Sequence, residues 1–144
     1  GNKRDLVAGL VKYINSQMRR ELQRTVARTR DRRDAERVGM LAFYKFLRQH
    51  RAIYRVVPEC EMIDREVSLW YYKKMSAGYI HGLQQGIDRG EVRNLPAIFL
   101  ARSLMGFTHF IGLKWIVWNA NAQPEIPSSV LKDMMEFILY GLQP

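Results

Sequence analysis

The sequence predicts an all-α fold of about six helices, and three observations favour it. Apolar residues recur at steps of three and four along most of the chain, the period of a helix that packs on one side. No stretch alternates apolar and polar residues between turn signals, and no Asn-Gly or Asp-Gly pair marks a hairpin. With 144 residues, 47% of them hydrophobic, the chain is long enough for a single domain, residues 1–144, with its own core.

The first helix is expected to begin near Asn2 and to continue to about Val26. Asn2 is a favourable N-cap residue, and Asp5 stands three positions later, where a capping box places an acid. One apolar stripe follows this helix, made of Leu6, Val7, Leu10, Val11, Ile14, Met18, Leu22 and Val26.

A turn is expected at Thr29–Arg33, where the apolar stripe gives way to basic residues, and a second, aromatic-rich helix from Asp34 to His50. A short helix should follow from Arg51 and end at Val57, because the residue before a proline disfavours helical geometry. The segment Pro58–Ile63 is then a linker, either irregular or with one helical turn.

A long helix is expected from Asp64 to Gly90, with Gly90 in the left-handed conformation that ends many helices. Three glycines lie four residues apart within it, at Gly78, Gly82 and Gly86. Each weakens a helix interior by up to about 1 kcal/mol relative to Ala. The row therefore predicts either the close approach of another helix or room beside a cavity.

The segment Leu95–Trp118 is predicted to be one long helix that is apolar on nearly every face. Such a helix must be buried on more than one side, so one side should face the core or a ligand cavity and the other a second subunit. A membrane span is disfavoured, because Arg102 and Lys114 are costly in hydrocarbon. After a break at Asn119–Pro127, the last helix is expected over Ser128–Leu142.

The charge is one-sided. The chain carries a net charge of +9, and residues 1–60 hold 15 basic and 6 acidic side chains, whereas residues 61–144 hold 8 of each. This predicts a nucleic-acid or other anionic neighbour at the basic part, or a solvated basic face. The single cysteine, Cys60, cannot form an internal disulfide, and no signal peptide opens the chain, so a cytoplasmic location is expected.

The sequence offers no constellation for catalysis or metal binding, so we expect neither an enzyme nor a cofactor. Its histidines, His50, His81 and His109, lie on different predicted helices without a second ligand at metal spacing. Gly-rich phosphate loops, CxxC, HExxH and GxSxG are absent. His109 stands in an apolar helix, where it either contacts a ligand or is a core histidine satisfied by a neighbour.

Aromatic and methionine residues are concentrated in the second, third, fourth and fifth predicted helices. They indicate either a plain core or a pocket lined by rings and sulfur, the usual composition of a small-molecule site. The residues in question are Phe43, Phe46, Tyr54, Trp70, Tyr71, Met75, Tyr79, Met105, Phe107, Phe110 and Trp115.

The order of these elements resembles the C-terminal effector-binding and dimerisation domain of TetR-family transcriptional regulators. The opening GNKRDLV is similar to the family's junction after the helix-turn-helix, with Lys3 and Leu6 in the matching places. FYKFLRQHRAIYRVV and WYYKKMSAGYIHGLQQGIDRGEVR are similar to its second, third and pocket helices, and LMGFTHFIGLKW to its first dimer helix.

The resemblance implies a helix-turn-helix domain before this chain, with residues 1–30 as the connecting helix. It implies a homodimer whose last two long helices form a four-helix bundle. An apolar or aromatic effector would tilt the connecting helix and thereby release a repressor from operator DNA. On this view the basic first part is the part nearest the DNA.

The resemblance also suggests two sets of site residues. Those expected to line the effector pocket are Phe43, Phe46, Tyr54, Trp70, Met75, Tyr79, Met105 and His109. Those expected at the dimer contact are Ala101, Met105, Thr108, Gly112, Trp115, Leu131, Met134, Phe137, Ile138 and Tyr140. The alternative is an all-helical dimeric interaction module with a solid core and no ligand.

Overall fold

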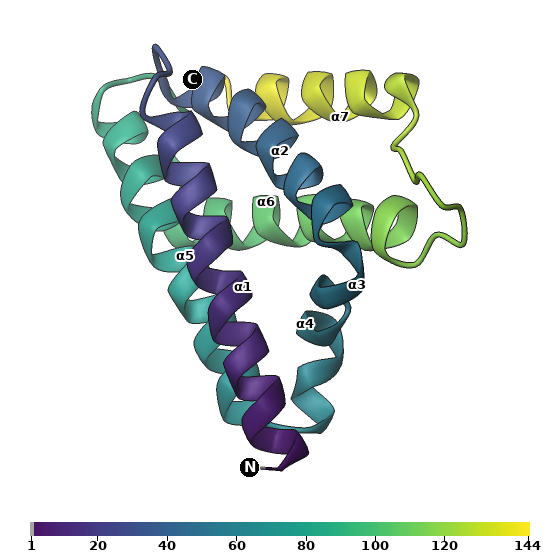
Figure 1. Cartoon of the computed structure of the whole chain (residues 1–144). Coiled ribbons are helices and arrows are strands. Elements are labelled where there is room, and N and C mark those ends of the chain that lie inside the picture. The colour runs from purple at the N-terminus through teal and green to yellow at the C-terminus, as the bar shows by residue number, and fades with distance from the viewer. Residues whose placement is uncertain (1) are drawn as a thin grey trace.

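The structure, a computed structural model, describes residues 2–144, and in that range it is all-α without a strand (Figure 1). The all-α prediction is therefore confirmed. Helices α1 and α5 pack side by side, α2 crosses α6, and α7 lies at the end of the molecule away from the N-terminus. The elements are α1 (Lys3–Val26), α2 (Arg32–Gln49), α3 (Arg51–Tyr54), α4 (Val56–Glu59), the 3-10 turn η1 (Cys60–Met62), α5 (Arg65–Asp88), α6 (Ala97–Gly112), the π-helical turn η2 (Leu113–Val117) and α7 (Ser128–Gly141).

Side-chain caps fix the starts of the three long N-terminal helices. The Asn2 side chain accepts a hydrogen bond from the backbone N–H of Asp5 at 2.9 Å, as the sequence predicts. Asp31 caps α2 in the same way, so that helix starts two residues earlier than expected. Asp64 caps α5 and also binds Arg4 at 3.0 Å, which holds the pKa of the Asp64 carboxyl below its ordinary value.

The short helical region differs from the prediction at Pro58. The chain breaks at Arg55 and then remains helical through Pro58, which is the third residue of α4. A proline is tolerated there because the first turn of a helix has no use for the missing N–H. The linker expected at Pro58–Ile63 is thus largely helical, ending in η1.

The central helix is shorter than predicted at both ends. Pro96 has an extended backbone and precedes α6 instead of lying in its first turn. After Gly112 the helix widens into η2, where the N–H of Trp118 bonds the carbonyl of Leu113 at 2.9 Å. A hydrogen bond between residues five apart is typical of a π-helical turn at an α-helix. The turn remains in the core, because Ile116 and Val117 are fully buried.

Two glycines of the α5 row have features of both predicted uses. The side chain of Arg32, at the start of α2, lies over Gly82 and Gly86, and both glycines also line a surface hollow, whereas Gly78 faces open space. Arg32 binds the buried carboxylate of Glu36 at 2.8 Å, and Tyr79 donates a hydrogen bond to the same carboxylate. A buried charge is tolerated only when it is paired and hydrogen-bonded in this way.

Gly86→Ala is expected to destabilise the fold by about 1–3 kcal/mol, the usual cost of overpacking. A Cβ at that position would lie 2.7 and 2.8 Å from Cβ and Cγ of Arg32, atoms too close to the backbone to swing away. Gly78→Ala is the matched control, because nothing lies within 4 Å of its Cβ, and it should be stabilising by up to about 1 kcal/mol. Urea unfolding measures the free energy of unfolding of both variants. Equal effects of the two substitutions would contradict the close contact between Gly86 and Arg32.

Candidate functional site

Three polar side chains from three helices meet inside the aromatic part of the core. The Tyr54 hydroxyl, on α3, lies 3.0 Å from Nδ1 of His109 on α6. The Tyr72 hydroxyl, on α5, lies 3.4 Å from Nε2 of the same imidazole. We refer to Tyr54, Tyr72 and His109 as the tyrosine–histidine cluster. Both ring nitrogens of His109 thus face a phenol.

Aromatic rings surround the cluster. Phe43 packs edge-on against Tyr54 with ring centroids 6.4 Å apart, and Tyr71 packs edge-on against Tyr72 at 5.2 Å. Tyr54 and Tyr71 are buried, whereas Tyr72 and His109 are half-buried. The cluster therefore lies at the border of the core, with one side deep and the other near the surface.

Burial sets the protonation states of all three members. Desolvation raises the pKa of Tyr54 well above its ordinary value and that of Tyr72 to about 12, so both phenols keep their protons at neutral pH. Desolvation lowers the pKa of His109 below 6.5. A neutral imidazole has one N–H donor and one acceptor nitrogen, so one tyrosine donates to His109 and the other accepts from it.

The structure brings together only part of the predicted pocket. Phe43, Tyr54 and His109 are in one cluster, while Phe46 packs against His50 at a ring distance of 4.2 Å. The Tyr79 hydroxyl donates to Glu36 and its ring lies under the guanidinium of Arg32. Trp70 lies at the surface with 36% of its area exposed. Met75 is half-buried and packs against the core, whereas Met105 is half-buried and is not part of the core cluster.

Tyr72 is the member that the sequence-based set missed. It lies three residues before Met75 and seven before Tyr79, both of which were selected, so it belongs to the same helical row. That spacing was the available signal. Aromatic content along the WYYKKM segment, by contrast, pointed equally to Trp70, which is on the outside.

The predicted dimer contact needs correction. Ala101, Gly112, Met134 and Ile138 are buried within the protomer and do not lie on its surface. The reason is α2, which packs under both helices: Leu47 and Tyr44 approach Gly112, and the Tyr44 hydroxyl donates to the Thr108 carbonyl at 3.0 Å. Four further predicted residues are half-buried, namely Met105, Thr108, Trp115 and Leu131.

Phe137 and Tyr140 do lie on the surface, 69% and 75% exposed. Other large apolar residues of α6 are exposed as well, and the two helices touch through Phe107 and Phe137, whose ring centroids lie 5.6 Å apart at an interplanar angle of 7°. We refer to the exposed apolar residues of α6 and α7 together as the α6–α7 face; they are Ile98, Phe99, Phe110, Phe137 and Tyr140.

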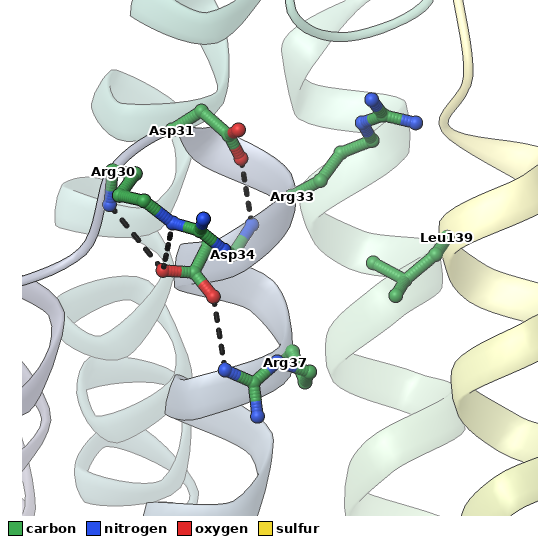
Figure 2. A pocket seen from close by; sticks show the side chains of 6 residues that line it. All are labelled: Arg30, Asp31, Arg33, Asp34, Arg37 and Leu139. Carbon is green, nitrogen blue, oxygen red and sulfur yellow. Dashed lines mark hydrogen bonds and ion pairs between the residues drawn. The ribbon is translucent and has the colours of Figure 1, made fainter.

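Two surface hollows lie elsewhere, at the end of the molecule where the α1–α2 turn meets the α5–α6 turn. One, of about 230 Å³, is lined by five charged residues of the α1–α2 region and by Leu139 (Figure 2). The other, of about 330 Å³, lies between the two turns. Neither is lined by any residue predicted to bind a ligand.

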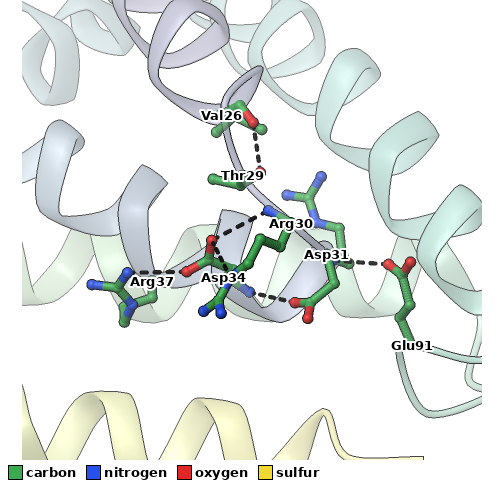
Figure 3. A network of polar contacts seen from close by, with 8 residues as sticks. Val26, Thr29, Arg30, Asp31, Asp34, Arg37 and Glu91 are labelled. Carbon is green, nitrogen blue, oxygen red and sulfur yellow. Dashed lines mark hydrogen bonds and ion pairs between the residues drawn. The ribbon is translucent and has the colours of Figure 1, made fainter.

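Most charged groups around these hollows are engaged with one another (Figure 3). Asp34 accepts from the backbone N–H of Arg30 and the side chain of Arg37, and hydrogen bonds from both hold its pKa below the ordinary value. Glu91 accepts from the backbone N–H of Arg32 at 2.9 Å and ties the two turns together. The network is well explained as structural.

A group of arginines lies around the α1–α2 turn. This turn is at the opposite end of α1 from Asn2 (Figure 1), roughly 36 Å away for a 24-residue helix. The arginines concerned are Arg24, Arg28, Arg30, Arg32, Arg33 and Arg37.

Within residues 2–144, no group of three or more His, Cys, Asp or Glu side chains is arranged to hold a metal ion. No helix of that range is long and apolar enough to cross a membrane. Cys60 is buried, donates its thiol to the Val57 carbonyl and has a pKa raised by burial. Comparison of the sequence with known protein families and with curated proteins finds no match.

His109 is expected to make the fold less stable as the pH falls below 6.5. Because burial lowers its folded-state pKa, the unfolded chain binds a proton first, and stability falls from pH 6.5 down to the folded pKa. The slope is limited to about 1.4 kcal/mol per pH unit for one proton. Thermal unfolding of His109→Gln between pH 7.5 and 5 should lack this component, whereas exposed His81→Gln should keep it; parallel wild-type and His109→Gln curves would contradict the assignment.

Proposed function

We propose that this chain is the effector-binding and dimerisation domain of a TetR-type transcriptional regulator, most simply a repressor. Its operator would be bound by a helix-turn-helix domain joined to α1, and its effector would be an apolar or aromatic small molecule. The proposal is supported by the helix order and, above all, by the two-sided use of α6.

Helix α6 is the observation that carries the proposal. One side packs into the core through Leu100, Ala101 and Leu104 and carries His109 into the tyrosine–histidine cluster. On the other side of the helix, Phe99 and Phe110 are exposed to solvent. Adjacent apolar rings exposed over two helices are typical of a protein–protein interface. A polar cluster within an aromatic core is typical of a ligand site.

A route from the cluster to α1 exists in the packing. Tyr71, next to Tyr72 on α5, accepts a hydrogen bond from buried Asn15 of α1 at 3.4 Å through its carbonyl. Its hydroxyl lies 3.8 Å from the sulfur of Met18, also on α1. A ligand that rests against Tyr72 and shifts this turn of α5 would therefore move the contacts that hold α1, the helix nearest the proposed DNA-binding domain.

The second candidate is a dimeric helical interaction module with a solid core. It is favoured by the direct packing of Phe43, Tyr54 and His109 against one another and by the position of the two hollows away from them. Both candidates use the α6–α7 face. They differ in whether the edge of the tyrosine–histidine cluster admits a small molecule.

Glutamate on the α6–α7 face should convert a dimer into monomers. Phe137→Glu and Phe110→Glu each place a charge where two copies of the apolar face would meet, and desolvating that charge opposes association. Native mass spectrometry should give twice 16.9 kDa for the wild type and 16.9 kDa for both variants. Leu69→Glu, an equally exposed change on α5, should stay dimeric.

A monomeric wild type at micromolar concentration would contradict the proposal. A dimer that persists in both variants but is lost in Leu69→Glu would place the interface on α5 instead. Circular dichroism of each variant serves as the control for folding, because these positions are exposed and a charge there should leave helicity unchanged.

Met75→Ala separates the two candidates by stability, because Met75 packs against the core one helical turn after Tyr72. In a solid core, truncating a methionine costs about 2–5 kcal/mol, and the lower end applies to half-buried Met75. Beside a ligand site the cost should be well below 2 kcal/mol, because part of the side chain has no packing partner to lose. Urea unfolding measures the change, with exposed Met62→Ala as the neutral control.

A further inference from the structure

The tyrosine–histidine cluster contains one more proton than its own hydrogen bonds use. The two phenols and the neutral imidazole supply three N–H or O–H protons. The two contacts to His109, at 3.0 and 3.4 Å, consume two of them. Which proton is left over depends on the imidazole tautomer.

With the proton on Nδ1, His109 donates to Tyr54 and accepts from Tyr72, and the spare proton is that of Tyr54. Tyr54 is fully buried, and His109 is the hydrogen-bond partner of its hydroxyl among the described residues, so this tautomer would leave a buried proton without an acceptor. With the proton on Nε2, Tyr54 donates to His109, His109 donates to Tyr72, and the spare proton is that of Tyr72.

Tyr72 is the only one of the two phenols that can offer its proton outward. Its side chain is half-buried, and His109 is its only hydrogen-bond partner among the described residues. A molecule resting on the outer side of Tyr72 with an acceptor atom would keep both His109 contacts and use the spare proton. The tautomer on Nε2 is then the one selected, with every polar atom of the cluster satisfied.

The electrostatics of the cluster disfavour a charged ligand. No charged side chain contributes to the pKa of His109, which is shifted by burial alone. The only carboxylate that influences Tyr72 is Glu61, whose negative charge raises the pKa of the phenol. An anion would meet no cation here, and burying an unpaired charge is expensive. The aromatic rings of Phe43, Tyr54 and Tyr71 suit an aromatic or apolar body.

We infer that the cluster binds an uncharged aromatic or apolar molecule through one hydrogen-bond acceptor, a carbonyl or ether oxygen, which accepts the hydroxyl proton of Tyr72. His109 is a positioning residue in this arrangement, since it acts by orienting Tyr72. The inference rests on the proposed function, because it specifies the effector class of the same site.

Three probes of similar shape test the inference: acetophenone carries the acceptor, ethylbenzene lacks it, and benzoate adds a charge. Dissociation constants from ligand-observed NMR should show acetophenone binding roughly three- to tenfold tighter than ethylbenzene, the net value of one hydrogen bond. Benzoate should bind more weakly than acetophenone. Ethylbenzene or benzoate binding as tightly as acetophenone, or no binding of acetophenone, would overturn the inference.

Tyr72→Phe removes the donor and keeps the ring. It should reduce the preference for acetophenone over ethylbenzene to about onefold without weakening ethylbenzene binding. Tyr13→Phe, an exposed change on α1, should preserve the preference. The ¹³C shift of the acetophenone carbonyl gives a second readout: hydrogen bonding should move it downfield in the wild type and in Tyr13→Phe, and not in Tyr72→Phe. A preference and shift that survive in Tyr72→Phe would overturn the inference.

The outcome is separable from that of the proposed function. A dimer without a preference for acetophenone overturns the inference and leaves the α6–α7 interface intact. A monomer that still prefers acetophenone overturns the proposed function and supports the cluster as a ligand site. Circular dichroism of Tyr72→Phe ensures that a lost preference reflects the missing hydroxyl and not loss of the fold.

Discussion

The close approach of α2 to α6 at Gly112 is the constraint on which the rest of the structure depends. A Cβ at Gly112 would lie 2.5 Å from Cδ1 of Leu47 and 3.3 Å from Tyr44, so a larger residue would require the end of the Leu47 side chain to move. Glycine therefore allows α2 and α6 to meet closely at this point. In this packing His109 faces the tyrosines of α3 and α5, and Phe110 lies at the surface. The same helix thus contributes both to the cluster and to the surface.

The local features of the fold could be predicted because they depend on neighbours in sequence. Asn2 and Asp64 cap helices at their predicted starts, and Gly90 has the positive φ of 74° expected of a helix end. The predicted helix end at Pro58 is wrong, because a new helix begins at Val56 and Pro58 falls in its first turn, where proline is tolerated. The prediction also failed to foresee the π-helical turn after Gly112, which no local pattern announced.

The sequence indicated some of the residues that lie together, and missed others. Composition drew attention to Phe43, Tyr54 and His109, which are neighbours in the structure, but periodicity and composition do not show which helix packs against which. Tyr79 could equally have faced a ligand; it faces Glu36, a buried acid whose importance no local pattern indicated. The residues assigned to the dimer contact failed for the same reason, because only the position of α2 shows that Gly112 and Met134 face inward.

The placement of the arginines has a consequence for how this protein behaves at a distance. Near the start of α1, Lys3, Arg4 and Arg65 offset part of the negative charge of Glu59, Glu61, Asp64 and Glu66, while the far end of α1 carries the arginine-rich turn. The arginine-rich end of α1 is therefore the more positive of the two. A polyanion would orient the protomer by the arginine-rich end, over a range limited to about 8–10 Å by physiological salt. The non-specific attraction of a polyanion would act at the arginine-rich end, whereas any contact made through the start of α1 would act at the opposite end. Added salt would weaken the electrostatic attraction and leave the other contact unchanged.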